Sequence, residues 1–533
     1  MKGIKSKIRR LMFAVLVCVL LANTLFVPGG IADTDTSNRR IGLLIGCPDA
    51  IVNNVKTRID PNDPNVTPII QDGRTLIPLR FVAECYGANV DWIEDTSTIK
   101  IQFERGKVEM VIGSKTMKVN NKEREIDVPA QIIDGRTMVP VRAFADAFEK
   151  YTFWDNRGLI IISDLSEKDI VDEYIGKFMV YERVSPEGRM AEHGYFGTCP
   201  ESPDGKLIAY VLYDNKPAPD AGLSAGLYIC DSDLTNHRKI RDIAETNWED
   251  GSYQIWVDNN HIAYMDMADG GKTYIVNING EVAYGPYEGY LGHGDAPDGA
   301  IPLWVDKTKY PNGSNLGPNG IYIFKDGKIT KAVDLEKDFG WLKAELEGSD
   351  NTDDWYMYHA ELSPGGTHLA IRLDTGKDMQ NLLTCKIDGT DVKLFPGKKP
   401  LHQQWYDDST LFGHDNYWNN LPYQAGRRWD RDGNVLETLS GVGCHLGISP
   451  DKRYLASETL YQSNPIVLRL YRVGSIEPLA ILSSESPGNV WSMRTHLNPS
   501  FSRDGKKVYF NKPIGDMVQL YRVDISNVIA TQN

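Results

Sequence analysis

Short runs of alternating apolar residues, each introduced by a polar turn, fill the chain from residue 176 to residue 526. The first turn reads Ser-Pro-Asp-Gly at 202–205, and the alternation after it predicts a strand with one buried face. Six further complete or degenerate copies of this turn begin at Trp256, Ala296, Ser363, Trp405, Ser449 and Ser502. Units of a turn plus several short strands, about 50 residues apart, predict a seven-bladed β-propeller, with six blades as the alternative.

The last predicted blade has only three strands before the chain stops near Asn527. An additional alternating run at 178–184 precedes the first blade and has no partner of its own. We predict that this run pairs with the last blade, because that pairing closes the ring and removes an exposed sheet edge.

Residues 40–165 contain a duplicated unit. The elements Gly-Arg-Thr, Pro and Arg-x-Phe recur 62 residues apart, beginning at Gly73 and at Gly135. Each copy predicts a turn, a strand at 75–79, a helix at 80–86 and a strand pair at 90–93 and 98–103, in the numbering of the first copy. The chain is therefore predicted to be mainly β, with a small α+β duplicated domain ahead of the propeller.

Residues 1–32 have the layout of a secretory signal. Five basic residues precede a nearly unbroken apolar run at 11–27, and Gly30-Ile31-Ala32 offers a small-x-small cleavage site before Asp33. An uncleaved N-terminal anchor is the alternative, since the run approaches the roughly 20 residues needed to cross a bilayer. With the signal removed, no other segment reaches that length, and we expect a secreted or cell-surface protein without a transmembrane segment.

The net charge argues against one class of partner, and the cysteine spacing predicts the state of the thiols. The 533 residues carry a net charge of −14, and without the five basic residues of the signal the remainder carries −19. Such an acidic body does not attract nucleic acid electrostatically, so no nucleic-acid partner is expected. The six cysteines after residue 32 have wide, irregular spacings without C-x-x-C, which predicts isolated buried thiols.

The repeated Gly-Arg-Thr…Pro…Arg motif resembles the copper amine oxidase N-terminal-like domain of cell-surface proteins from Gram-positive bacteria, a stalk-like domain without the oxidase core. An amine oxidase would need Asn-Tyr-Asp/Glu and His-x-His, but Asn416-Tyr417 is followed by Trp418 and no His-x-His occurs. We therefore expect no topaquinone copper site. The arginines of the motif have acids close by in the sequence, and a structural role is predicted for Arg74, Arg80, Arg136 and Arg142.

The Ser-Pro-Asp-Gly repeats resemble WD40-like or TolB-type propeller repeats. In such repeats the strand entering the turn is innermost, so residues four before each turn should lie near the central channel. These positions are Thr198, Ser252, Gly292, His359, Leu401, His445 and Asn498. His293, His402 and His496 lie one or two positions away, so five histidines gather on inner strands.

The segment 496–505 is distantly similar to a segment of oligogalacturonate-lyase-type propellers, which hold a divalent metal in the channel. This similarity implies His496, with His445, as possible metal ligands. Two positions depart from the pattern, because Asn498 and Met493 stand where a histidine and a glutamine are expected. No cofactor is certain, and a divalent metal in the channel is possible on this basis.

Blade five, together with His359 of blade four, carries residues that suit a uronate lyase or a glycan binder. Catalytic candidates, which would move a proton or hold a carboxylate, are His359, His414, Tyr417 and Arg427. Substrate-binding candidates, which would stack on sugars or contact a carboxylate, are Trp405, Trp418, Arg428 and Trp429.

Three functions remain open from the sequence. The first is an exported cell-envelope protein in which a stalk-like domain presents a propeller for ligand or glycan binding, with a glycan or cell-wall polymer as the partner. The second is a polysaccharide lyase acting on uronates in the channel. The third is a scaffold for another surface protein.

Overall fold

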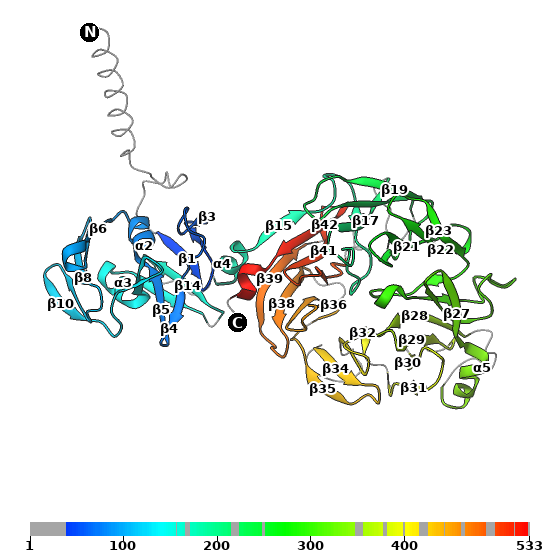
Figure 1. The fold of residues 1–533 in the computed structure, drawn as a ribbon. Coiled ribbons are helices and arrows are strands. Elements are labelled where there is room, and N and C mark those ends of the chain that lie inside the picture. Colours follow the sequence, from blue (N-terminus) through cyan, green and yellow to red (C-terminus); the bar gives the residue numbers. More distant parts are fainter. Residues whose placement is uncertain are drawn as a thin grey trace, which may run out of the picture. The chain divides into compact units, whose positions relative to one another are not determined.

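The computed structural model describes residues 39–155, 157–165, 171–214, 223–247, 251–346, 355–376, 381–397, 400–414, 425–441, 443–459, 464–486, 496–515 and 517–530. The chain divides into two compact units, Met1–Val171 and Asp172–Asn533 (Figure 1). The predicted signal at 1–32 lies outside the described residues. Among the described residues, no helix is both long and apolar enough to cross a membrane.

Three antiparallel sheets build the first unit. One has the order β13-β14-β1-β2-β3, with β13 at Tyr151–Trp154, β14 at Leu159–Ser163, β1 at Arg40–Leu44, β2 at Asp49–Val52 and β3 at Val55–Arg58. Another has the order β10-β9-β8-β7-β6, with β10 at Lys122–Glu125, β9 at Thr116–Val119, β8 at Gly106–Val111, β7 at Thr98–Phe103 and β6 at Asn89–Ile93. The third has the order β11-β12-β5-β4, with β11 at Gln131–Ile133, β12 at Arg136–Pro140, β5 at Arg74–Pro78 and β4 at Ile69–Gln71.

The two copies of the duplicated unit meet at their Gly-Arg-Thr strands. Strands β5 and β12 pair antiparallel with Ile77 opposite Val139, and each continues through a proline into a helix, α2 at Leu79–Cys85 or α3 at Val141–Phe148. Both helices bury one face in the core of this unit. The predicted strand–helix order is confirmed, with bounds that differ from the sequence prediction by no more than a residue in the first copy.

Three of the four motif arginines have structural partners, as predicted, but two of these partners come from the other copy. Arg136 of the second copy has its Nε 2.7 Å from Oδ2 of Asp60 in the first copy. In the same way, Arg74 of the first copy forms an ion pair with Asp127 of the second copy. Arg80 pairs within its own helix with Glu84 at 3.6 Å. For Arg74 and Arg136 the sequence pointed to acids close by in the chain, because it cannot show that the copies pack around their paired strands.

The second unit contains seven four-stranded antiparallel sheets in the described residues, which follow one another around a centre (Figure 1). Six of them use strands consecutive in the chain. The first three comprise β16 (Ala191–Glu192), β17 (Leu207–Tyr213), β18 (Ala225–Asp231) and β19 (Arg238–Ile243); β20 (Ile255–Trp256), β21 (His261–Asp266), β22 (Lys272–Asn277) and β23 (Val282–Tyr287); and β24 (Tyr290–Leu291), β25 (Ile301–Val305), β26 (Gly320–Lys325) and β27 (Lys328–Asp334). The next three comprise β28 (Tyr356–Leu362), β29 (His368–Asp374), β30 (Asn381–Lys386) and β31 (Lys393–Leu394); β32 (Leu401–Trp405), β33 (Thr410–His414), β34 (Gly426–Asp430) and β35 (Val435–Thr438); and β36 (Leu446–Ile448), β37 (Tyr454–Glu458), β38 (Ile466–Arg472) and β39 (Pro478–Glu485).

The remaining sheet joins the two ends of this unit. It contains β40 (Ser500–Phe501), β41 (Lys507–Ile514) and β42 (Met517–Asp524), and β15 (Val180–Arg183) pairs antiparallel with β42. The predicted use of the early strand to complete the last sheet is therefore confirmed. Short helices flank these strands: α4 (Val171–Lys177), α5 (Leu335–Phe339) and α6 (Ser526–Ala530).

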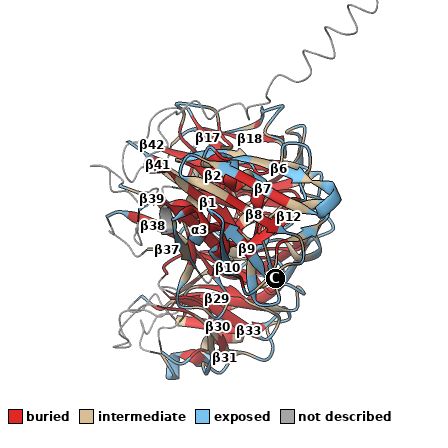
Figure 2. Ribbon diagram, turned by 90° about the vertical axis from the view of Figure 1, so that its left-hand side faces the viewer, coloured by how far each residue is buried: buried red, intermediate tan, exposed pale blue. Residues whose placement is uncertain are grey.

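Side chains link neighbouring sheets. Trp256 Nε1 donates to the carbonyl oxygen of Pro200 at 2.8 Å, and Trp405 Nε1 donates to that of Glu361 at 3.2 Å. The last sheet contacts the first through Tyr509, whose hydroxyl donates to Glu201 Oε1 at 2.7 Å. Buried residues are concentrated in the strands (Figure 2), and all six described cysteines are buried free thiols, as predicted. This is the β-propeller architecture that the repeats predict.

Candidate functional site

A bulge in the inner strands decides which side chains face the centre of the propeller. The pairing register shifts between Tyr358 and Glu361 and between Leu401 and Gln404. His359 and His402, inside these two bulges, both have a left-handed backbone, with φ of 47° and 48°. Such a conformation is costly for a residue other than glycine and is kept where the surrounding packing requires it.

The structure also corrects the predicted register by one residue in two strands, because two of the turns are one residue shorter than the others. In the regular turns the amide of the first residue bonds five residues onward, as from Ser363 to His368 at 2.9 Å. In the degenerate turns the bond spans four residues, from Tyr406 to Thr410 and from Val257 to His261. The turns therefore begin one residue later than the sequence suggested, and His402 and Tyr253, which both have a positive φ, replace Leu401 and Ser252 at the equivalent position.

An inner cavity at the centre is nearly filled by aromatic rings. Its volume is about 10 Å³, the space of roughly one water molecule. Tyr195 lies 4.8 Å from His293 and Phe196 lies 4.6 Å from His445, measured between ring centroids. Burial lowers the pKa of His293 to about 3, and burial also holds the pKa of His359 and His402 well below its usual range. The imidazoles around this cavity are therefore neutral at physiological pH.

Glu458 organises the histidines predicted as metal ligands. Its Oε1 accepts from Nδ1 of His445 and, at 2.9 Å, from Nδ1 of His496, while its Oε2 accepts from the amide of Leu497. Burial opposes ionisation of Glu458, but the two facing imidazoles outweigh it and lower its pKa to about 2. An ionised carboxylate only accepts hydrogen bonds, so both Nδ1 atoms carry protons. The predicted pair is thus brought together around a carboxylate.

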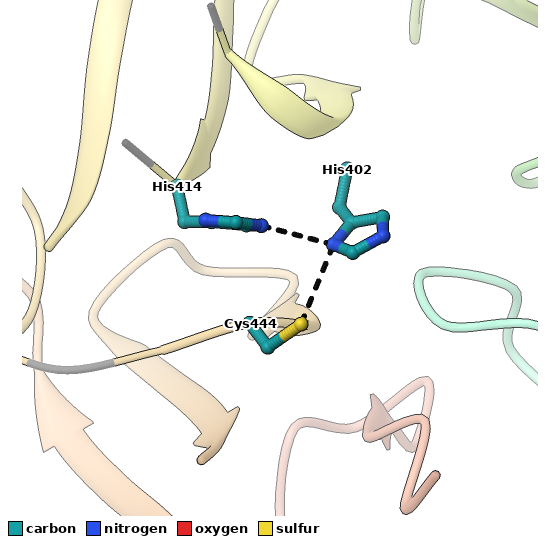
Figure 3. Close-up of side chains that lie close together, drawn as sticks. All are labelled: His402, His414 and Cys444. Atoms are coloured by element: carbon teal, nitrogen blue, oxygen red, sulfur yellow. Dashed lines mark hydrogen bonds between the residues drawn. The ribbon is translucent and has the colours of Figure 1, made fainter. Parts of the chain in front are cut away.

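Three further side chains converge beside this network (Figure 3). His414 Nε2 lies 3.0 Å from His402 Nδ1, and Cys444 Sγ lies 3.6 Å from the same nitrogen. His414 and Cys444 are buried, whereas His402 keeps part of its surface on the inner cavity. The predicted catalytic residue His414 therefore faces a histidine and a thiol.

An outer cavity of about 380 Å³ opens among the turns of the propeller. Residues of six sheets and their turns line it, including Gln404, Tyr406, Phe412, Lys452 and Phe501. Its cationic Arg503 is neutralised by Asp295, whose Oδ2 lies 2.6 Å from Nη1. Lys452 Nζ lies 4.6 Å from the centre of the Tyr406 ring.

Glu361 lines both cavities. Burial raises the pKa of its carboxyl to about 8, which the weak hydrogen bond from the Trp405 amide, at 3.4 Å, does not offset. Glu361 is therefore mostly protonated at neutral pH and presents a hydroxyl as well as a carbonyl oxygen. Strongly shifted carboxyls inside a cavity are candidates for proton transfer and for ligand recognition.

The residues predicted for blade five are not brought to one surface. Trp429 is 1% exposed and packs with Trp405 in the apolar core of this region, so Trp429 offers no face to a sugar. Arg428 pairs with Glu437 at 2.7 Å, and Arg427 donates to Thr438 Oγ1 at 3.0 Å. Trp405 borders the outer cavity and His359 the inner one, whereas Tyr417 and Trp418 lie outside the described residues.

Sequence reasoning missed Glu361, Glu458 and Cys444 as site residues. Glu458 ends strand β37 and Glu361 lies two residues before a turn, and no local motif marks either of them. Only the pairing of separate sheets places Glu458 against His496, 38 residues away.

Comparison with known protein families gives the class of the first unit. Residues 51–162 match the family model of the copper amine oxidase N-terminal domain, and the predicted resemblance of the duplicated unit is confirmed. The chain thus joins such a domain to a β-propeller. No curated protein matches the chain.

Solved structures of the predicted kinds are similar to this chain at low sequence identity. Oligogalacturonate lyase from Vibrio parahaemolyticus is 13% identical, with 70% of this chain and 96% of that chain covered and a TM-score of 0.46. An oligogalacturonate lyase in complex with manganese is 14% identical over the same shares, with a TM-score of 0.45. TolB from Acinetobacter baumannii is 12% identical, with 83% and 82% covered and a TM-score of 0.29. Likeness at this level says nothing of activity.

Proposed function

We propose that this chain is an exported cell-envelope protein whose N-terminal domain presents a β-propeller that binds a segment of a neutral glycan. The outer cavity of about 380 Å³ carries this proposal. Its volume lies within the range of small-molecule sites, and aromatic and hydrogen-bonding side chains from several sheets converge in it.

The outer cavity carries little charge beyond Lys452, which suits a neutral ligand. Arg503 is paired with Asp295, and Glu361 is mostly uncharged at neutral pH. Lys452 remains as a donor beside the Tyr406 ring. Aromatic faces with a few fixed donors and acceptors suit sugar rings and their hydroxyls. The net charge of −14 for the whole chain disfavours polyanions at long range.

Export rests on the basic residues and the apolar run at 11–27. Expressed in a Gram-positive host, the protein should appear outside the cell with Asp33 as its first residue. Mass spectrometry of the secreted chain measures this directly. A full-length chain in the membrane fraction would instead establish an uncleaved anchor, and a cytosolic chain would contradict export.

Glycan binding is tested with neutral oligosaccharides, using cello-, manno- and xylo-oligosaccharides as probes beside oligogalacturonate. At least one neutral probe should bind, and Ile448→Trp, which fills the outer cavity, should abolish that binding. Lys452→Asn removes the donor but tolerates the left-handed backbone there, and it should weaken binding about tenfold. Lys206→Asn, on an exposed turn outside the cavity, is the control. Binding that survives Ile448→Trp would place the ligand elsewhere.

A uronate lyase is the second candidate, and Glu361 favours it. A carboxyl with a pKa near 8 exchanges protons readily at neutral pH, as a general base or acid requires. An unsaturated, ultraviolet-absorbing product from oligogalacturonate, lost in Glu361→Gln, would favour this candidate over a binder. The absence of both product and glycan binding would leave the scaffold role.

A further inference from the structure

The side chains of His402, His414 and Cys444 converge from two neighbouring sheets (Figure 3). His402 lies in β32, His414 ends β33, and Cys444 lies just before β36. One ligand atom from each lies within 4.8 Å of the others. His402 Nδ1 is the shared point, 3.0 Å from His414 Nε2 and 3.6 Å from Cys444 Sγ.

These separations suit the coordination shell of one metal ion. Around a tetrahedral ion with metal–nitrogen bonds of about 2.0 Å and metal–sulfur bonds of about 2.3 Å, a nitrogen and a sulfur ligand lie about 3.5 Å apart and two nitrogen ligands about 3.3 Å apart. The observed 3.6 Å and 3.0 Å lie close to these values. A hydrogen-bonded cluster would join the three groups only in pairs, whereas an ion contacts all of them at once.

The surroundings keep nitrogen lone pairs available. His445 donates its Nδ1 proton to Glu458, and its Nε2 is buried without a hydrogen-bond partner in the described part of the chain. The ring centroids of His445 and His402 are 4.2 Å apart. A fourth nitrogen, oriented by a carboxylate, therefore lies beside the three side chains.

We propose that His402, His414 and Cys444 bind one late first-row transition-metal ion, Zn²⁺ or Cu²⁺, which ties two neighbouring sheets of the propeller together. Two imidazoles and a thiolate suit these ions, whereas Mg²⁺, Ca²⁺ and Mn²⁺ prefer oxygen ligands. The thiol proton leaves to solvent as the metal–sulfur bond forms. This set is different from His445 and His496, whose Nδ1 atoms both bond Glu458. The ion has a structural role, because His414 and Cys444 are buried.

The test titrates the full-length protein, stripped of metal with a chelator, with Co²⁺, Zn²⁺ and Cu²⁺ in separate arms. Co²⁺ should bind at one equivalent and give a sulfur-to-metal charge-transfer band, which Zn²⁺ should displace while raising the melting temperature. A more intense visible band and tighter binding with Cu²⁺ would identify copper as the preferred ion.

Variants assign the ligands. Cys444→Ser should lose the sulfur-to-metal band, and His414→Gln should weaken metal binding and shift the Co²⁺ spectrum. Cys385→Ser, which changes a buried thiol in another sheet, should keep both band and stoichiometry. If Cys444→Ser does not fold, the spectrum of His414→Gln decides. Failure to bind one equivalent, or a site lost in Glu458→Gln but unchanged in His414→Gln, would overturn the assignment.

Discussion

Glu361→Gln should stabilise the propeller at alkaline pH and leave its stability nearly unchanged at acid pH. Burial raises the pKa of the Glu361 carboxyl from 4.5 to about 8. Between these values the unfolded chain loses the proton while the folded chain keeps it, so the stability that protonation provides is full below about pH 4.5 and is lost as pH rises through about 8. The loss is about 1.4 kcal/mol per pH unit, or about 5 kcal/mol over the interval. Glutamine has no proton to lose.

The measurement is urea unfolding of both proteins at about pH 5, about pH 7 and about pH 9, where the difference in unfolding free energy should grow steadily. Comparing variant with parent at each pH cancels the titration of all other groups. Glu477→Gln changes an exposed glutamate in the same unit and should show no such trend. A pH-independent difference for Glu361→Gln would mean that this carboxyl is ionised in the folded protein at neutral pH.

The strand order of the propeller could be predicted because each signal for it is local. Alternation follows each turn within a few residues, and the unpaired run at 178–184 had one plausible partner, the incomplete last sheet. The register of the strands was harder to predict from the sequence. The turns at Val257 and Tyr406 are one residue shorter than the others, so His402 rather than Leu401 lies in the bulge. Counting the alternation back from a turn of assumed length cannot show that difference.

The sequence predicted which types of residue gather at the site, but not which residues contact one another there. Histidines on inner strands did meet at the centre, since every inner strand borders it. Tryptophans near one another in blade five did not form a platform, because Trp405 and Trp429 supply apolar volume to the core between strands. Glu458 and Cys444 act through contacts with residues of other strands, so no spacing in the sequence marks them. For the same reason the sequence does not show that Arg74 and Arg136 each form an ion pair with an aspartate of the other copy.

Glu458→Ala should cost the propeller about 3–5 kcal/mol, the usual effect of breaking a buried charged hydrogen-bond network. The Glu458 side chain is fully buried and accepts hydrogen bonds from His445, His496 and the amide of Leu497. Removing it leaves these donors buried without their acceptor. The carboxylate joins strand β37 to the segment that leads into β40, so its loss acts on the contact between two sheets.

A matched control lies in the same sheet. Glu485, at the end of β39, pairs with Lys512 at 2.8 Å while both side chains are 26% exposed, so Glu485→Ala should cost less than about 1 kcal/mol. Urea unfolding near pH 7 measures both variants. Because the pKa of Glu458 is lowered from 4.5 to about 2, its stabilisation is present above about pH 4.5 and is lost as pH falls toward 2. The gap between Glu458→Ala and the parent should therefore narrow on acidification. Equal costs for the two alanine variants, or a gap that widens in acid, would show that Glu458 does not hold these sheets together as an ionised acceptor.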